Sequence, residues 1–292
     1  MHFQFLKINV ILLLTFVSFS VFSQDTTNLR YFMQSGSERP SAISYGNNPA
    51  ASHYVRSGDA RIYYEVYGNG KPIVVLHGGI VGSTLEMGRF IDSLSRDYKV
   101  IAISTRGHGK SEMGSAVPSY EQKAEDVMAV IQSVTNEKVM ILGFSDGAYT
   151  GYFFAKNYPD KIEKLIAIGA GEWKKGFREF GMTSAVAFAM DEQYWKQQLA
   201  LRPEPNRLDE WFETTGKYYN SVNIGQAVFK SIGCPVLVMA GEKDQNAPLQ
   251  TVIDAYHTIP NAQLSIIPNT PHPVFLINFE AVWSCITPFL SE

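Results

Sequence analysis

The sequence has few cysteines and almost no excess of charge of one sign. Only Cys234 and Cys285 occur among its 292 residues, so a disulfide-stapled scaffold and a cysteine-rich zinc site are excluded. The 25 basic and 28 acidic residues nearly balance and form no block of like charge, which argues against nucleic acid as a partner. Hydrophobic residues make up 45% of the chain, a share typical of a globular protein with a large core.

Long apolar runs are also scarce: the chain has a single one, which lies near its start. Lys7 precedes the apolar run 8–22, and Ser23 lies just before the polar Gln24. The run is shorter than the ~20 residues that a membrane-spanning helix needs. We therefore predict a secretory signal peptide over 1–23, cleaved near Ser23, with an uncleaved membrane anchor as the alternative. The protein is then expected to be exported, periplasmic or secreted, with no stable membrane insertion.

The mature chain is predicted to consist of a leader, a core and an insertion. Residues 24–51 are rich in Ser, Asn, Gly and Pro and lack apolar periodicity, so we expect an extended leader, with order beginning near His53. The core is expected over 52–170 and 231–292. The insertion between these two parts, 171–230, contains no strand-like run and is predicted to be a helical lid.

The core alternates apolar, β-branched runs with helix-length amphipathic segments. One such segment, 120–134, places Ala124, Val127 and Val130 on one helical face. Near-continuous apolar strands joined by helices indicate an α/β fold, with a mostly parallel sheet covered on both faces. The strands are expected at Arg61–Val66, Ile73–Leu76, Val100–Ile103, Val139–Leu142, Leu165–Ile168, Val236–Ala240 and Leu264–Ile267.

The strongest chemical signal is the segment GFSDG at 143–147, which follows the expected strand 139–142 and precedes a helix-like stretch. A sharp strand-to-helix turn needs small residues two positions before and after its centre, and it exposes the central hydroxyl at the carboxyl edge of the sheet. We therefore predict Ser145 as a nucleophile. The backbone N–H of Asp146, at the start of the helix, is predicted as an oxyanion donor.

A second oxyanion donor is predicted in the turn after the strand 73–76. The sequence there is HGGI at 77–80, and its glycines let the backbone come close to a reacting group, so the N–H of Gly79 can pair with that of Asp146. Ile80 is the alternative donor if the turn is offset by one residue. We interpret His77 as a brace for this loop.

A serine nucleophile needs a histidine base. His272 lies in a proline-rich loop after the expected strand 264–267, at the same edge of the sheet as Ser145. His257, the other late histidine, falls within a helix-like segment, where a surface or capping role is expected. We therefore predict His272 as the base.

The base needs a carboxylate to orient it. The acids that leave the carboxyl ends of strands after the elbow are Glu172, Glu242 and Asp244. Asp244 closes the turn immediately after the strand 236–240 and is our predicted partner, which completes a triad of Ser145, Asp244 and His272.

Taken together, these motifs resemble those of the α/β-hydrolase superfamily and occur in that family's order. They are the HGG turn at 77–79, RGHGKS at 106–111, GFSDG at 143–147, GEKD at 241–244 and His272. The elbow and single lid are most similar to biphenyl-hydrolase-like and non-haem haloperoxidase-like esterases. Thr105 departs from the family pattern, which usually has Asp there, and Pro271 replaces the usual small Gly. The resemblance implies an α/β-hydrolase fold, with no metal and no organic cofactor.

The expected function is hydrolysis of small carboxylic esters through an acyl-enzyme, as in a carboxylesterase. Hydrolysis of carbon–carbon bonds, lactones or thioesters uses the same triad and stays open, as does a ligand-binding sensor with slow turnover. The expected partner is a small-molecule ester. We predict Ile80, Trp173, Trp195 and Trp211 as walls of its pocket. The side chain of Asp146 either complements the helix dipole or selects esters that carry an ammonium group.

Overall fold

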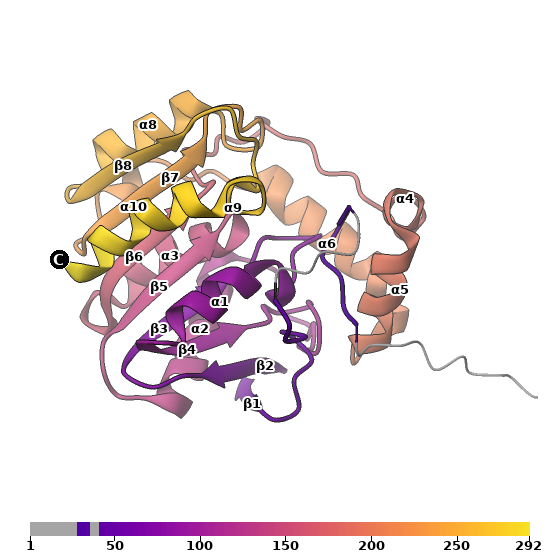
Figure 1. The fold of residues 1–292 in the computed structure, drawn as a ribbon. Helices are drawn as coiled ribbons and strands as arrows, with labels where there is room; N and C mark the ends of the chain where they lie inside the picture. The colour runs from indigo at the N-terminus through magenta and orange to yellow at the C-terminus, as the bar shows by residue number, and fades with distance from the viewer. Residues whose placement is uncertain (1–27, 36–40) are drawn as a thin grey trace, which may run out of the picture.

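The computed structural model describes residues 28–35 and 41–292, and the predicted signal peptide at 1–23 lies outside them. The described chain forms an eight-stranded sheet in the order β1-β2-β4-β3-β5-β6-β7-β8 (Figure 1). β2 pairs antiparallel with both β1 and β4, and every other neighbouring pair is parallel. The strands are β1 Ser52–Ser57, β2 Ala60–Tyr67, β3 Lys71–Leu76, β4 Tyr98–Ile103, β5 Val139–Phe144, β6 Ile162–Ile168, β7 Val236–Gly241 and β8 Ala262–Ile267.

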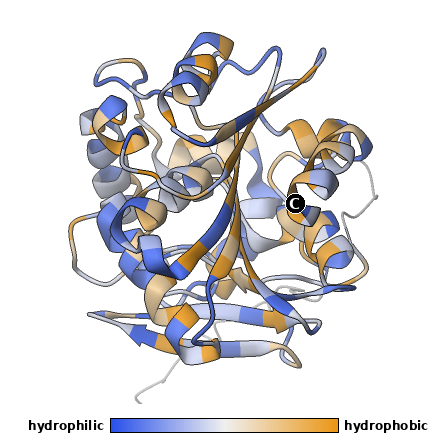
Figure 2. Ribbon diagram, turned by 90° about the vertical axis from the view of Figure 1, so that its left-hand side faces the viewer, coloured by the Kyte–Doolittle hydropathy of each residue, from blue (hydrophilic) through white to orange (hydrophobic). Residues whose placement is uncertain are grey.

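Helices cover both faces of this sheet (Figure 2). Alternation along β3 directs Val74 and Leu76 into one core, shared with α2, α3 and α8, and Ile73 and Val75 into another, shared with α1 and α10. The longer helices are α1 Gly88–Leu94, α2 Tyr120–Val134, α3 Asp146–Asn157, α4 Ser184–Met190, α5 Glu192–Leu201, α6 Leu208–Ser221, α8 Leu249–Thr258 and α10 Phe279–Ser291. The short ones are η1 Thr84–Met87, η2 Pro159–Lys161, η3 Pro205–Arg207, α7 Gln226–Phe229 and α9 Val274–Ile277.

The predicted α/β fold and mostly parallel sheet are confirmed, and each of the seven predicted strands lies within an observed one. The strand that sequence reasoning missed is β1. It lies at the edge of the sheet, where Tyr54 is 48% exposed. An edge strand buries little, so it carries no apolar run to identify it.

The segment before the sheet differs from the expected extended leader with order beginning near His53. Tyr45 is buried, and its hydroxyl donates a hydrogen bond of 2.6 Å to Asp92. The backbone N–H of Met33 donates to Asp191, 2.8 Å away, at the start of α5. Residues 28–35 and 41–51, the described parts of the leader, are therefore attached to the core and to the lid, although they contain no helix or strand.

The insertion at 171–230 contains α4 to α7 and contributes no strand to the sheet. An antiparallel bridge between Trp173 and Ile224 joins its two ends. No helix in the described part of the chain is long and apolar enough to cross a bilayer. Cys234 and Cys285 are free and partly buried.

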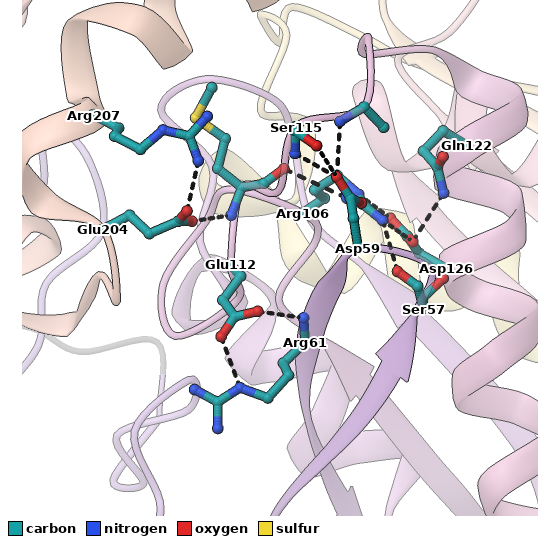
Figure 3. Close-up of polar contacts among 12 residues, drawn as sticks. Ser57, Asp59, Arg61, Arg106, Glu112, Ser115, Gln122, Asp126, Glu204 and Arg207 are labelled. Carbon is teal, nitrogen blue, oxygen red and sulfur yellow. Dashed lines mark hydrogen bonds and ion pairs between the residues drawn. The ribbon is translucent and has the colours of Figure 1, made fainter.

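An ion cluster, centred on the buried Arg106, secures the loop between β4 and α2 (Figure 3). Arg106 Nε and Nη2 donate to the two carboxylate oxygens of Asp126 at 2.9 and 2.8 Å, while Nη1 donates to Asp59 at 2.7 Å. Hydrogen bonds from the Ser115 backbone and from Arg106 hold the pKa of Asp59 well below its usual range. Every nitrogen of this guanidinium has an oxygen partner, as a buried charge requires.

Candidate active site

Ser145 lies on the sharp turn between β5 and α3 and has a strained backbone, with φ 51° and ψ −112°. A Cβ at Gly143 would lie 2.4 Å from the carbonyl oxygen of Gly147, and one at Gly147 would lie 2.5 Å from that of Leu76. Glycine is therefore required at both positions for the turn to close. Because strained backbone conformations cluster at functional sites, this strain supports a functional role for Ser145.

A hydrogen-bonded chain runs from Ser145 through His272 to Asp244. His272 Nε2 lies 2.9 Å from Ser145 Oγ, and His272 Nδ1 lies 2.7 Å from Asp244 Oδ2. The other oxygen of Asp244 accepts the backbone N–H groups of Asn246 and Ala247, at 2.8 and 2.7 Å. Asp244 thereby fixes the tautomer with a proton on Nδ1, which leaves Nε2 free to accept the serine proton.

The other candidates for these roles lie elsewhere. Glu172 forms an ion pair with Lys174 at 2.8 Å, and Glu242 accepts the backbone N–H of Asn269 at 2.8 Å. His257 is exposed on α8, and its ring contacts that of Tyr256 at a tilt. None of them contacts His272 or Ser145.

The loop after β3 places Gly79 and Ile80 beside the serine. A Cβ built on Gly79 would lie 2.9 Å from Cβ of Asp146, so the two backbones that carry the predicted donors are adjacent. Ile80 has a positive φ of 50°. Hydrogen bonds of the His77 ring fix this loop. Its Nδ1 donates to Gly78 O at 2.7 Å, and its Nε2 accepts the backbone N–H of Thr105 at 3.1 Å. Burial lowers the pKa of His77 to about 4, so the ring is neutral and braces the loop.

A buried carboxyl supports the same loop. Glu86 Oε1 accepts the backbone N–H of Gly78 at 2.7 Å. Burial raises the pKa of Glu86 to about 8, against the opposing effect of the N–H groups of Gly78 and Ser83. Within residues 28–35 and 41–292 no cation pairs with this carboxyl.

The side chain of Asp146 is fully engaged within the protein. Lys123 Nζ lies 2.7 and 2.6 Å from its two oxygens, and the hydroxyl of Tyr219 donates to Oδ1 at 2.5 Å. Both charged side chains are at most 9% exposed. Lys123 already neutralises the carboxylate, which argues against a role for Asp146 in selecting ammonium-bearing substrates.

A cavity of about 190 Å³ opens onto Ser145 and His272. Of the four predicted wall residues, Ile80 and Trp173 line it. The structure places Trp195 and Trp211 elsewhere: Trp195 packs against Tyr194 and Phe212 inside the lid, and Trp211 packs against His108. The remaining wall comes from Val81, Tyr120, Arg178, Phe180, Met182, Tyr219 and Asn246, with Gly79 and Asp146 at the floor.

Sequence reasoning missed Lys123 and Arg178. Lys123 interrupts the apolar stripe of α2, four residues before Val127, and a lone cation on a buried face was the available signal. Arg178 is a cation among the lid aromatics Trp173, Phe177 and Phe180, a weaker signal. Among the described residues, no group of three or more His, Cys, Asp or Glu side chains has the arrangement of a metal site.

Comparison with known proteins places this geometry in a family. Residues 71–207 match the family model of the α/β-hydrolase fold. The chain is 23% identical over 250 residues to the human serine hydrolase BPHL, covering 80% of this chain and 84% of that protein. It is 24% identical over 268 residues to a non-heme haloperoxidase of Rhodococcus erythropolis, covering 81% and 98%. A solved serine hydrolase involved in carbazole degradation superposes with a TM-score of 0.69 at 22% identity, covering 82% and 98%.

The chain is a member of the α/β-hydrolase superfamily. The resemblance seen in its motifs is confirmed, and the protein is a hydrolase of this superfamily.

Proposed function

We propose that this protein is a serine hydrolase that cleaves small carboxylic esters through an acyl-enzyme on Ser145. The observation that carries the proposal is the unbroken chain from Ser145 Oγ to His272 and on to buried Asp244, at 2.9 and 2.7 Å. Both distances lie within the reach needed for proton transfer.

The first half-reaction forms the acyl-enzyme. Ser145 Oγ attacks the ester carbonyl while its proton passes to His272 Nε2, and the carbonyl oxygen becomes an oxyanion held by the N–H groups of Gly79 and Asp146. The carbon–oxygen bond to the alcohol then breaks. His272 returns the proton to the departing alkoxide, which leaves as the alcohol.

The second half-reaction releases the acid. A water molecule gives a proton to His272 and attacks the acyl carbon, and the bond to Ser145 Oγ breaks as that oxygen recovers the proton. Asp244 stays ionised throughout and stabilises the imidazolium in both halves. The cavity of about 190 Å³ favours short acyl groups.

Turnover of p-nitrophenyl esters from acetate to octanoate tests the proposal. We expect a maximum at short to medium acyl length, with an initial burst of nitrophenol if acyl-enzyme breakdown limits the rate. Thermal-shift titration with the same esters separates an enzyme from a sensor. Stabilisation without any product would contradict the proposal.

We also propose that the protein acts on such esters after export, with the chain beginning at Gln24. Mass spectrometry of the mature protein provides the test. A protein that still begins at Met1 in the cytosol would contradict this part of the proposal alone.

A further inference from the structure

Several side-chain polar atoms of residues that line the cavity at Ser145 have no hydrogen-bond partner in the described part of the chain. Arg178 Nε and Nη2, Trp173 Nε1 and the hydroxyl of Tyr120 are buried, and among the described residues none of them has a hydrogen-bond partner. All three side chains line this cavity. A buried donor without an acceptor is costly, and a buried charge without one costs more. Such a cluster indicates a site for an acceptor from outside.

Arg178 carries the charge in this group. Its guanidinium stacks over the Trp173 ring at 4.3 Å. Burial raises the pKa of Tyr149 to about 12 and also raises the pKa of Tyr219, and the charge of Arg178 opposes both effects. The positive charge therefore lies close to the inner wall of the cavity.

The acids nearest the reacting serine are already committed. Asp146 pairs with Lys123 and accepts from Tyr219, and Asp244 pairs with His272. Within the described residues, Arg178 itself forms no ion pair. The cavity therefore contains an uncompensated positive charge, which a neutral ester would leave unpaired.

Arg106 shows which ligand the open edge of Arg178 fits. Arg106 uses Nε and Nη2 together to bind both oxygens of Asp126, at 2.9 and 2.8 Å (Figure 3). In Arg178 these same two nitrogens, which form one edge of the planar guanidinium, are the ones without a partner. That edge matches the two oxygens of a carboxylate.

We propose that the substrate carries a carboxylate that binds the Nε–Nη2 edge of Arg178, so that the enzyme cleaves esters of small dicarboxylic acids in preference to neutral esters. This rests on the proposed ester hydrolysis and assigns Arg178 as its specificity residue. The indole N–H of Trp173 supplies a further donor in the same cavity. Lys123 does not bind the substrate carboxylate, because its ammonium group already pairs with Asp146.

Matched substrates test the proposal directly. The mono-p-nitrophenyl ester of adipic acid and p-nitrophenyl hexanoate share a six-carbon acyl chain and a leaving group, and they differ in the terminal carboxylate. With spontaneous hydrolysis subtracted, we expect kcat/KM of the wild type to favour the adipate ester. In Arg178→Met this preference should fall by about 10- to 100-fold, the range for a lost charged hydrogen bond.

Two further variants exclude indirect causes. Lys175→Met removes an exposed cation three residues away and should leave the preference unchanged. Arg178→Lys keeps the charge without the planar fork and should recover part of the preference. An unchanged preference in Arg178→Met, an equal loss on both esters, or an equal loss of preference in Lys175→Met would overturn the proposal. If Arg178→Met does not fold, the preference must fall in Arg178→Lys.

Binding without turnover separates this proposal from the proposed reaction. In Ser145→Ala, calorimetry should give a lower Kd for the adipate monoester than for the hexanoate ester, and the difference should vanish in Ser145→Ala with Arg178→Met. If the wild type hydrolyses neither ester but this binding difference is present, the proposed reaction fails and the carboxylate site stands. Equal Kd values for the two esters would reject the site.

Discussion

Two arginines of this protein, the buried Arg106 and the half-buried Arg178, are in opposite electrostatic situations. Arg106, in the loop before α2, donates to Asp126 through Nε and Nη2 and to Asp59 through Nη1. Arg178, in the lid, has a buried Nε and Nη2 for which the described residues supply no acceptor. Both guanidiniums are held by the protein, but only that of Arg106 is neutralised by it.

The contrast distinguishes polar groups that maintain the fold from polar groups that serve a ligand. A structural ion cluster is closed, because every unpaired member would reduce stability. A binding site keeps donors open, and the binding of its ligand compensates their desolvation. The paired Asp146 at the floor of the cavity belongs with the first kind, although it adjoins Ser145.

The largest expected effect is that of replacing Ser145, the proposed nucleophile. Ser145→Ala should lower kcat by about 10⁴–10⁶-fold, because the proposed acyl-enzyme forms on the Ser145 hydroxyl. The free energy of unfolding should change little. Stopped assays with p-nitrophenyl esters and urea unfolding measure the two quantities. Retention of a tenth of the wild-type activity would remove Ser145 from its proposed role.

His272→Ala provides the matched test of coupling. It should reduce activity about as much as Ser145→Ala, and the double variant should be no worse than either single one, since the two residues act as a unit. Additive losses would mean that they act in separate steps.

Asp244→Asn is expected to have the next largest effect, a loss of about 10³–10⁴-fold in kcat, because the amide no longer selects the imidazole tautomer or stabilises the imidazolium. Glu172→Gln is the control, since Glu172 pairs with Lys174 instead. A silent Asp244→Asn beside an inactive Glu172→Gln would reassign the acid.

Arg106→Met tests the ion cluster in which every charge is paired. Removing the cation leaves Asp126 buried and unpaired, so the free energy of unfolding should fall by about 3–5 kcal/mol. Folded molecules should keep their kcat/KM, because the cluster does not contact Ser145. Arg61→Met removes the exposed pair with Glu112 (Figure 3) and should destabilise far less, because water screens that pair. Similar losses for the two variants would contradict the distinction.

Glu86→Gln should have the smallest effect, visible as a change in pH dependence. Burial raises the pKa of Glu86 to about 8, whereas an unfolded chain ionises this group near its ordinary value of about 4.3. Between these values the folded state binds the extra proton, so rising pH lowers stability until about pH 8. The variant cannot ionise, and its stability should fall less between pH 5 and pH 8.

Urea unfolding of Glu86→Gln at several pH values provides this measurement. Glu112→Gln is the matched control, because the hydrogen bond from Arg61 lowers the pKa of Glu112, and its contribution is already constant above pH 5. An identical pH slope in wild type and Glu86→Gln would show that Glu86 does not hold the extra proton.

Local sequence was sufficient to predict the seven apolar strands and the elbow. Their signals are short: an apolar run for a buried strand, and glycine two positions on either side of Ser145. His272 and Asp244 were predictable because parallel strands deliver their following loops to one edge of the sheet. β1 was not, because an edge strand needs little apolar surface.

In the lid, the sequence did not predict which aromatic side chains line the cavity. Trp173, Trp195 and Trp211 look alike in the sequence, yet Trp173 lines the cavity and the other two pack inside the lid or against the core. Which face of a short amphipathic helix meets which neighbour depends on the helices packed around it. Sequence periodicity predicts which face of a helix is buried, but it does not predict which element packs against that face.

The sequence by itself determined the seven strands with apolar runs, the serine turn and the order of Ser145, Asp244 and His272, because each depends on residues close together in the chain or on the direction of parallel strands. The tertiary structure alone decided which charges are paired. Lys123 and Asp146 are 23 residues apart and neutralise one another, while Arg178 is left with an open edge beside Ser145. Ion pairing depends on distances of a few ångströms between side chains from different elements, and only the packed molecule sets those distances.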